Sequence, residues 1–339
     1  MPNLEPDTLF ETAMAAHKRG DLDAARKAYE EVLENDPQHA GAWMNLGVLY
    51  RATGASEAAI AALRRAEGLA PDHESILYNL GNALMDSNAL DAAIGVYRRA
   101  LQTAPTFADA YNNLGEAYIR KGDRKTAIAQ FRAGLERKGT HTGLLVNLGN
   151  ALHHEGEPDA ALSYLSRALE ASPNSIAIRR NLSNVLRTLG YLSAAEDMLQ
   201  EALERAPDDA NAQVLLAFCK FAQGKFDAAW DAYAHRWRSD HHEPARRFEA
   251  PLWAGQSLAR KKLLIWGEQA VGDELMFATM YDELSNMTSD IHVETEYRLL
   301  PLFQRSFPQF KIYARRTPPA TSTQDSFQCC ISDQGSGTS

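Results

Sequence analysis

The sequence is poor in cysteine and has no long apolar stretch. Its 339 residues include only three cysteines, Cys219, Cys329 and Cys330, which are too few for a disulfide framework and lack the spacing of a zinc site. No apolar run approaches the ~18 residues of a membrane span, and the N-terminal MPNLEPDTLFETAMAAHKRG contains no apolar signal core. These absences predict a protein of the reducing cytoplasm with no membrane insertion.

Basic residues are also in short supply. The net charge is −9, and no segment has the basic excess expected of a nucleic-acid binder, although an acidic balance does not itself identify a partner. Asp240, His241 and His242 are clustered, but no other potential metal ligands accompany them, so we interpret them as part of a solvated linker. We therefore expect no metal and no cofactor in this chain.

What the sequence does contain is a 34-residue repeat. The tripeptide NLG occurs at 45–47, 79–81, 113–115 and 147–149, and NLS follows at 181–183. Each unit closes with a proline or a glycine, which we number position 32: Pro37, Pro71, Pro105, Gly139, Pro173 and Pro207. On this numbering position 15 is glycine or asparagine, position 20 is alanine, and position 24 is tyrosine, leucine or phenylalanine.

Each recurring residue suits a pair of packed helices. Position 15 is a turn in which glycine or asparagine adopts a left-handed conformation, and the closing proline ends the second helix. Alanine at position 20 allows close approach of the helices, and the large residue at position 24 fills the layer between units. With Trp43, Leu46, Gly47 and Tyr50, the pattern resembles the tetratricopeptide repeat, W-x2-L-G-x2-Y…A-x3-F…P, over about seven units in residues 4–238. The resemblance implies an all-α, right-handed superhelix with a concave groove lined by first helices.

One polar residue recurs beside the packing leucine. Position 6 is asparagine in five units: Asn45, Asn79, Asn113, Asn147 and Asn181. The side chain lies about 100° around the helix from the leucine at position 7, so it belongs to the groove face. An amide has two donors and an acceptor, so a row of amides predicts binding to the backbone of an extended peptide. Position 9 extends this polar face with Asn82, Glu116, Asn150 and Asn184.

Such a row is similar to the one in the superhelix of O-linked N-acetylglucosamine transferase. Single asparagines at this position also occur in the carboxylate clamps of chaperone-binding proteins, but a clamp needs flanking cations, and only Arg120 and Arg180 are available. A structural alternative stays open, in which each asparagine bonds a neighbouring helix. Whether the asparagines act as a row or as a clamp, the predicted partner is a protein or peptide.

The repeat pattern ends near residue 238. KKLLIW (261–266), DIHVET (290–295) and FKIYAR are predicted strands, separated by helical patterns in ELMFATMYDELSNM (274–287) and YRLLPLFQRSF. This alternation favours parallel βαβ units, in which ligands bind beyond the carboxyl ends of the strands. The loop after the first strand therefore provides the site candidates Glu268, Gln269, Gly272 and Asp273, although Asp273 as a helix N-cap is an equally serious alternative.

The stretch from Trp253 through LLIWGEQAVGDELMFA resembles a domain of bacterial repeat proteins related to heptosyltransferase-like, GT-B glycosyltransferases. Their motif is W-x-G…LL-x-x-x-E-Q-G-x-G-D-E, and Ala270 stands where it usually has glycine. The resemblance implies Asp273 as a catalytic base and a nucleotide-sugar donor in a longer, complete enzyme. We expect a solenoid at 1–238, a linker at 239–260, a partial Rossmann-like unit at 261–316, and a disordered or truncated tail at 317–339.

Two functions follow as hypotheses. The first is a protein-binding module that holds an extended polypeptide in the groove. The second is a protein glycosyltransferase whose repeats present the acceptor. Because a second Rossmann half is missing after residue 316, we expect this chain to have no transferase activity by itself.

Overall fold

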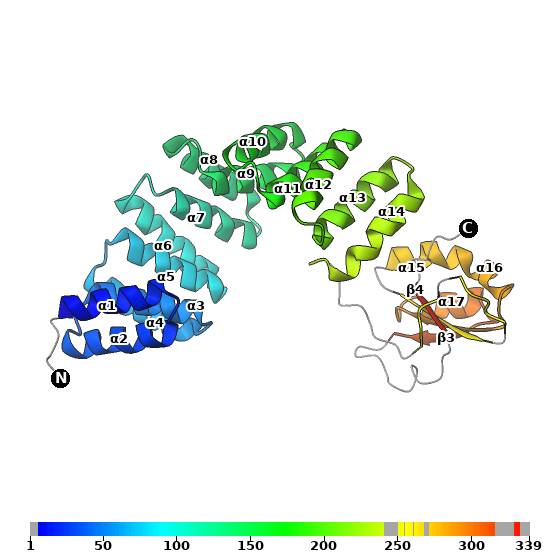
Figure 1. Cartoon of the computed structure of the whole chain (residues 1–339), viewed down its shortest axis with the longest axis horizontal. Helices are drawn as coiled ribbons and strands as arrows, with labels where there is room; N and C mark the ends of the chain where they lie inside the picture. The colour runs from blue at the N-terminus through cyan, green and yellow to red at the C-terminus, as the bar shows by residue number, and fades with distance from the viewer. Residues whose placement is uncertain are drawn as a thin grey trace. The chain divides into compact units, whose positions relative to one another are not determined.

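The computed structural model describes residues 6–240, 250–253, 255–259, 261–267, 271–315 and 329–332. The chain divides into two compact units, Met1–Asp208 and Asp209–Ser339, and each is described by itself. The first unit contains only helices in its described part, whereas the second combines helices with a small sheet. Figure 1 labels these elements along the chain.

Twelve helices form the first unit as six antiparallel pairs. In each pair the odd-numbered helix is the first helix of a repeat and the even-numbered helix is the second. Their bounds are α1 (Pro6–Lys18), α2 (Leu22–Asn35), α3 (Ala40–Ala52), α4 (Ser56–Leu69), α5 (Glu74–Asp86), α6 (Leu90–Thr103), α7 (Ala108–Arg120), α8 (Arg124–Arg137), α9 (Thr142–His154), α10 (Pro158–Ala171), α11 (Ile176–Thr188) and α12 (Leu192–Arg205).

The turns within the pairs have the predicted left-handed backbone. The glycines at position 15 have φ between 75° and 85°, and Asn88, which replaces glycine there, has φ of 60°. Asparagine is one of the few other residues that tolerate this conformation. Two of the second helices, α2 and α8, then begin at a side-chain cap: Asp21 accepts the backbone N–H of Ala24, and Asp123 that of Thr126, both at 3.1 Å.

Glycine at position 8 allows four of the first helices, α3, α5, α7 and α9, to approach their own second helices closely. A Cβ added to Gly149 would lie 2.6 Å from Leu165 Cγ, which is closer than real Cβ contacts. The Tyr97 and Phe131 rings occupy the corresponding space against Gly81 and Gly115, and all three large side chains at position 24 are almost completely buried. Position 24 therefore fills the layer that the missing Cβ leaves open.

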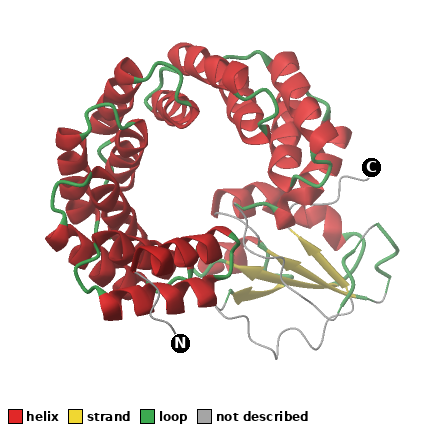
Figure 2. Cartoon of the chain, turned by 60° about the vertical axis from the view of Figure 1, so that its left-hand side comes forward, coloured by secondary structure: helices red, strands yellow, loops and turns green. Residues whose placement is uncertain are grey.

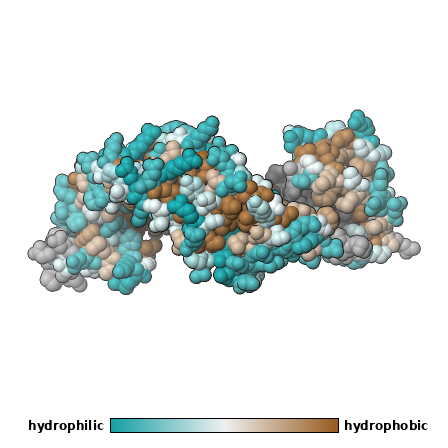
Figure 3. All heavy atoms as spheres, turned by 90° about the horizontal axis from the view of Figure 1, so that it is seen from above, coloured by the Kyte–Doolittle hydropathy of each residue, from teal (hydrophilic) through white to brown (hydrophobic). Residues whose placement is uncertain are grey.

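The first helices also contact one another from repeat to repeat, from α1 with α3 to α9 with α11. This contact makes them the inner layer of the curved double layer of helices in Figure 2. Hydrophilic residues predominate on the face drawn in Figure 3, with apolar residues between them. These stacked helix pairs have the arrangement that the 34-residue period predicts.

The second unit begins with another helix pair. It contains α13 (Ala210–Ala222), α14 (Phe226–Tyr233) and the short 3₁₀ helix η1 (Ala234–Arg238). The 34-residue period placed these helices in the solenoid at 1–238, whereas the boundary between compact units falls at residue 208. Within the second unit, Trp237 of η1 packs on Trp266, with ring centroids 5.7 Å apart.

A four-stranded parallel sheet follows, with order β3-β2-β1-β4. Its elements are β1 (Lys262–Trp266), α15 (Val271–Phe277), η2 (Ala278–Met280), α16 (Tyr281–Ser285), β2 (Asp290–Thr295), α17 (Leu300–Ser306), β3 (Lys311–Ala314) and β4 (Cys329–Ser332). Ile265, Val293, Tyr281 and Phe303 belong to one apolar core, so these helices cover one face of the sheet.

Two details differ from the sequence-based expectations. The helix expected at 274–287 is divided by the 3₁₀ turn η2, and four residues of the expected tail form β4. β4 pairs with the open edge of β1, from Leu263 with Cys329 to Trp266 with Ser332. A strand this short depends on its partner for hydrogen bonds, so the sequence around it gives little local signal.

Candidate functional site

The five asparagines at position 6 lie on first helices of the first unit, and all are half-buried. They occupy α3, α5, α7, α9 and α11 in turn. All five asparagines are therefore on the inner layer of first helices. Their hydrogen bonds, however, differ from repeat to repeat, and these differences decide which amides can bind a ligand.

Asn113 belongs to a network that joins two repeats. Its Nδ2 donates to Asn82 Oδ1 at 2.7 Å and to the Tyr78 hydroxyl at 3.2 Å, both on α5. Asn82 is 6% exposed and also accepts the Tyr97 hydroxyl at 2.6 Å. Burial raises the pKa of Tyr97, so its hydroxyl remains protonated and donates. Asn113 Oδ1 accepts a third bond, from Asn112. For Asn113, these contacts are the ones expected if the asparagine bonds a neighbouring helix instead of a ligand.

Asn147 and Asn79 use fewer of their hydrogen-bond donors and acceptors than Asn113 does. Asn147 Nδ2 donates one hydrogen bond, to Asn112 Oδ1 of the preceding repeat at 3.0 Å. Asn79 Nδ2 donates to the Ser75 carbonyl within its own helix at 2.9 Å. An amide has two donor hydrogens and two acceptor lone pairs, so within the described residues each of these side chains has one N–H and its oxygen available.

The remaining asparagines have other neighbours. Burial raises the pKa of the Tyr29 hydroxyl, and a hydrogen bond with Asn45 opposes that rise. Asn184 Oδ1 accepts Arg187 Nη2 at 2.8 Å, so this amide is partly engaged by its own helix. Asn181 is half-buried on α11. The row of asparagines is therefore regular in backbone position and irregular in bonding.

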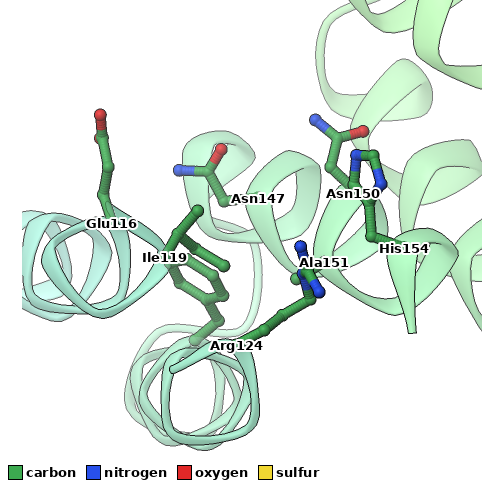
Figure 4. Close-up of a pocket in the computed structure, with 8 residues that line it drawn as sticks. Glu116, Ile119, Arg124, Asn147, Asn150, Ala151 and His154 are labelled. Atoms are coloured by element: carbon green, nitrogen blue, oxygen red, sulfur yellow. The ribbon is translucent and has the colours of Figure 1, made fainter. Parts of the chain in front are cut away.

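A pocket of about 360 Å³ opens between α7 and α9, above α8. Asn147 and Asn150 line it together, with their amides on the same side as the Glu116 carboxylate (Figure 4). Its other lining residues are Ile119, Arg124, Phe131, Ala151 and His154. Two of the predicted peptide-binding amides thus meet at one concave feature whose lining is partly apolar and partly polar, which suits a side chain more than a flat backbone.

Cations near this pocket already have partners. Arg124 Nη1 lies 3.0 Å from Glu155 Oε1. Arg120 donates to the Met85 carbonyl at 2.8 Å and to Asn88 Oδ1 at 2.9 Å, so its guanidinium holds two repeats together. This arrangement does not favour a carboxylate clamp at Arg120.

A second candidate site lies at the carboxyl edge of the sheet. Gly272 and Asp273 are in the first turn of α15, after β1, with Gly272 exposed and Asp273 half-buried. Asp273 is therefore inside the helix and does not cap it. The other two candidates, Glu268 and Gln269, lie outside the described residues.

The next residue, Glu274, is the one that sequence reasoning missed. It is 2% exposed, and its Oε2 accepts Thr295 Oγ1 at 2.6 Å and the Glu296 backbone N–H at 3.0 Å. Its other oxygen pairs with Arg315. A Cβ at Gly267 would overlap both charged groups. One carboxylate thus joins the ends of β1, β2 and β3. Its only signal in the sequence was the final Glu of the GDE motif.

A polar cluster occupies the opposite face of the sheet. His292 alternates with the core residues of β2, and its ring nitrogens lie 3.0 Å from Asp290 Oδ1 and 3.1 Å from the Tyr313 hydroxyl. Lys311 Nζ donates to the same Asp290 oxygen at 2.9 Å. Burial lowers the pKa of His292. Among the described residues, no group of three or more His, Cys, Asp or Glu side chains has metal-binding geometry.

Comparison with known proteins places the repeats in a family. Models of the tetratricopeptide repeat match residues 10–74 and 112–176, and 152–213 and 190–246, while another repeat model of this type matches 81–122. The chain therefore belongs to the tetratricopeptide repeat proteins, and its repeats form a protein–protein interaction module. No helix within the described ranges combines the length and the apolar character needed to cross a membrane.

Individual relatives match parts of the chain. Protein FlbA of Caulobacter vibrioides is 38% identical over 113 residues, which are 32% of this chain and 18% of that protein. A tetratricopeptide repeat protein from Parabacteroides merdae has a TM-score of 0.57 at 18% identity, over 70% of this chain and 93% of that one. Pseudomonas aeruginosa pilF has a TM-score of 0.55 at 18% identity, over 61% and 95%. The two structures show likeness of fold alone.

Proposed function

We propose that the groove of the first unit binds an extended polypeptide, and that amides at positions 6 and 9 hydrogen-bond its backbone. The observation that supports this most directly is the free capacity of Asn147 beside the pocket that it shares with Asn150. A half-buried amide with an unused donor and acceptor gains from a peptide partner that supplies both. With a net charge of −9, the proposed partner is a protein and not a nucleic acid.

The asparagines fall into two groups according to how many of their amide donors and acceptors are hydrogen-bonded within the described residues. Asn79 and Asn147 are the proposed ligand contacts, and we include Asn45, Asn150, Asn181 and Asn184 with them as predicted groove residues. Asn113 and Asn82 bond each other and two tyrosines, so they contribute first to the joint between repeats. The proposed groove therefore reads backbone with amides that the solenoid leaves free.

A double variant tests this proposal. Peptides are selected on the wild-type chain by display, and their affinity is measured by fluorescence anisotropy for wild type and for Asn79→Ala with Asn147→Ala. Each lost hydrogen bond is worth about 0.5–1.5 kcal/mol, so affinity should fall by roughly 5- to 150-fold at little cost in stability. Unchanged affinity in a folded double variant would refute backbone recognition by these amides.

A second candidate function is glycosyl transfer from a nucleotide-sugar to a protein acceptor. It is favoured by the parallel order β3-β2-β1-β4, which is the order found in half of a Rossmann-like domain, and by Asp273 in the first turn of α15, the helix that follows β1. In this proposal Asp273 is the general base and Gly272 allows close approach of the ligand. Incubation with labelled nucleotide-sugars and lysate proteins tests it. Because the proposed activity belongs to a longer, complete enzyme, transfer by such a chain that Asp273→Asn abolishes is the expected result, and transfer that survives Asp273→Asn contradicts it.

The proposed location is the cytoplasm. It rests on the small number of cysteines, three in 339 residues, which favours a reducing compartment. Fractionation of cells that express the untagged chain tests this location, and recovery outside the cytoplasmic fraction would contradict it.

A further inference from the structure

The pocket between α7 and α9 contains a charge that backbone recognition does not use. Glu116 is an exposed residue of α7, and its carboxylate extends beside the Asn147 amide at the rim (Figure 4). No hydrogen bond or ion pair to the Glu116 carboxylate occurs within the described residues. The nearby Arg124 guanidinium is balanced by Glu155, at 3.0 Å. Glu116 is therefore the carboxylate of this pocket with the freedom to pair with a ligand.

The lining below Glu116 is apolar. Ile119, which is 36% exposed, and Ala151 come from the two first helices, and the Phe131 ring comes from α8. His154 stands beside Asn150 on the other side of the pocket, away from Glu116 (Figure 4). A long side chain can lay its methylene groups against this lining and keep a charged end at the rim.

We propose that this pocket selects a lysine or arginine side chain of the bound peptide. The methylene stem packs on Ile119, the cationic end pairs with Glu116, and Asn147 bonds the backbone next to it. An acidic side chain at this position is repelled by the Glu116 carboxylate. A wholly apolar side chain excludes water from that carboxylate without replacing the hydrogen bonds that the water made. The inference rests on the proposed function and adds sequence preference to a groove that otherwise reads backbone.

A charge-reversal experiment tests the pocket. Each position of a display-selected peptide is replaced in turn by arginine, glutamate or alanine, and the affinities are measured by anisotropy for the wild-type chain and for Glu116→Lys. We expect one position at which wild type prefers arginine to glutamate by about five- to tenfold, since a partly exposed ion pair contributes about twofold to fivefold and the like-charge contact opposes binding. Glu116→Lys should reverse the preference at that position alone.

Glu170→Gln is the matched control, because Glu170 is an exposed glutamate on the second helix α10. It should leave every preference unchanged. If Asn79→Ala with Asn147→Ala weakens binding but the charge scan is flat, or is unaffected by Glu116→Lys, the pocket inference is wrong and backbone recognition survives. If the asparagine variant leaves binding unchanged while Glu116→Lys reverses a preference, backbone recognition fails and the pocket stands. A preference for glutamate in wild type also overturns the inference.

Discussion

Asn82→Ala is expected to weaken the joint between two repeats without removing a proposed ligand contact. The Asn82 oxygen accepts the Tyr97 hydroxyl at 2.6 Å and the Asn113 amide at 2.7 Å. Tyr97 is 0% exposed, so its hydroxyl loses its acceptor where water does not replace it. Asn113 is half-buried and keeps its bond to Tyr78.

The magnitude follows from this difference in burial. An unpaired buried hydroxyl costs about 1–3 kcal/mol, whereas the half-buried amide of Asn113 adds little. We therefore expect Asn82→Ala to lower the free energy of unfolding by about 1–3 kcal/mol. Asn147→Ala, which loses one half-buried hydrogen bond, should cost about 0.5 kcal/mol or less.

A double-mutant cycle makes the test specific to the Asn82–Tyr97 bond. Tyr97→Phe removes the hydroxyl that Asn82→Ala leaves unpaired, so the double variant should lose less stability than the two single variants together, by about 1 kcal/mol. Urea unfolding followed by circular dichroism measures the cycle, provided that the slopes of the transitions agree, because stacked repeats can unfold in parts. Additive costs, or an Asn82→Ala variant as stable as wild type, would refute this reasoning.

Three further predictions concern stability. Gly115→Ala places a Cβ against the Phe131 ring and should lower the free energy of unfolding by about 1–3 kcal/mol. Gly95→Ala, on open helix surface, should raise it by about 0.5–1 kcal/mol. Thermal unfolding compares the two variants, and equal effects contradict the packing argument. Burial raises the pKa of Glu67, but hydrogen bonds from Arg64 and Arg99 lower it by more, so the pKa lies below its ordinary value of 4.5. The stability from Glu67 is thus present above about pH 4.5 and lost as the pH falls through the lowered pKa, so Glu67→Gln should lose less stability than wild type between about pH 5 and about pH 3. Glu274→Ala leaves Arg315 unpaired and should cost about 2–4 kcal/mol, less than the ~3–5 kcal/mol of a fully buried pair because Arg315 is 25% exposed; a near-native urea midpoint for the sheet would contradict the role of this carboxylate.

The solenoid was predictable because its signals are local and repeat. Glycine at position 15 is required by a left-handed turn, and the one exception, Asn88, also adopts positive φ. The glycine at position 8 and the large residue at position 24 fit each other in four units, as Gly149 and Leu165 illustrate. Each rule concerns residues within one repeat, so the sequence of that repeat is sufficient to infer it.

The bonding of the asparagines was not predictable in the same way. Periodicity located Asn113 and Asn147 on the groove face, but their partners are Asn82 and Asn112, which lie 31 and 35 residues away. Asn112 stands at position 5, where the other repeats have different residues, and Asn82 stands at position 9, which is asparagine in only some of the repeats. Whether an amide is free therefore depends on the neighbouring repeat, which the consensus does not describe.

The α/β region shows the same limit more strongly. Apolar runs were sufficient to predict β1, β2 and β3. The three partners of Glu274 lie 21, 22 and 41 residues away, so they meet only after the sheet has formed. No local pattern distinguishes this buried glutamate from Asp273, the half-buried acid directly before it.

The bonds that join successive first helices have a mechanical consequence. Asn113 with Asn82, Asn147 with Asn112, Arg120 with the Met85 carbonyl, and His153 with Thr188 at 2.8 Å all run along the inner layer of the helical stack. Straightening the stack lengthens these short, directional bonds first, whereas tightening it does not stretch them. The curved solenoid should therefore behave as an asymmetric spring, stiffer when a load opens it than when a load closes it.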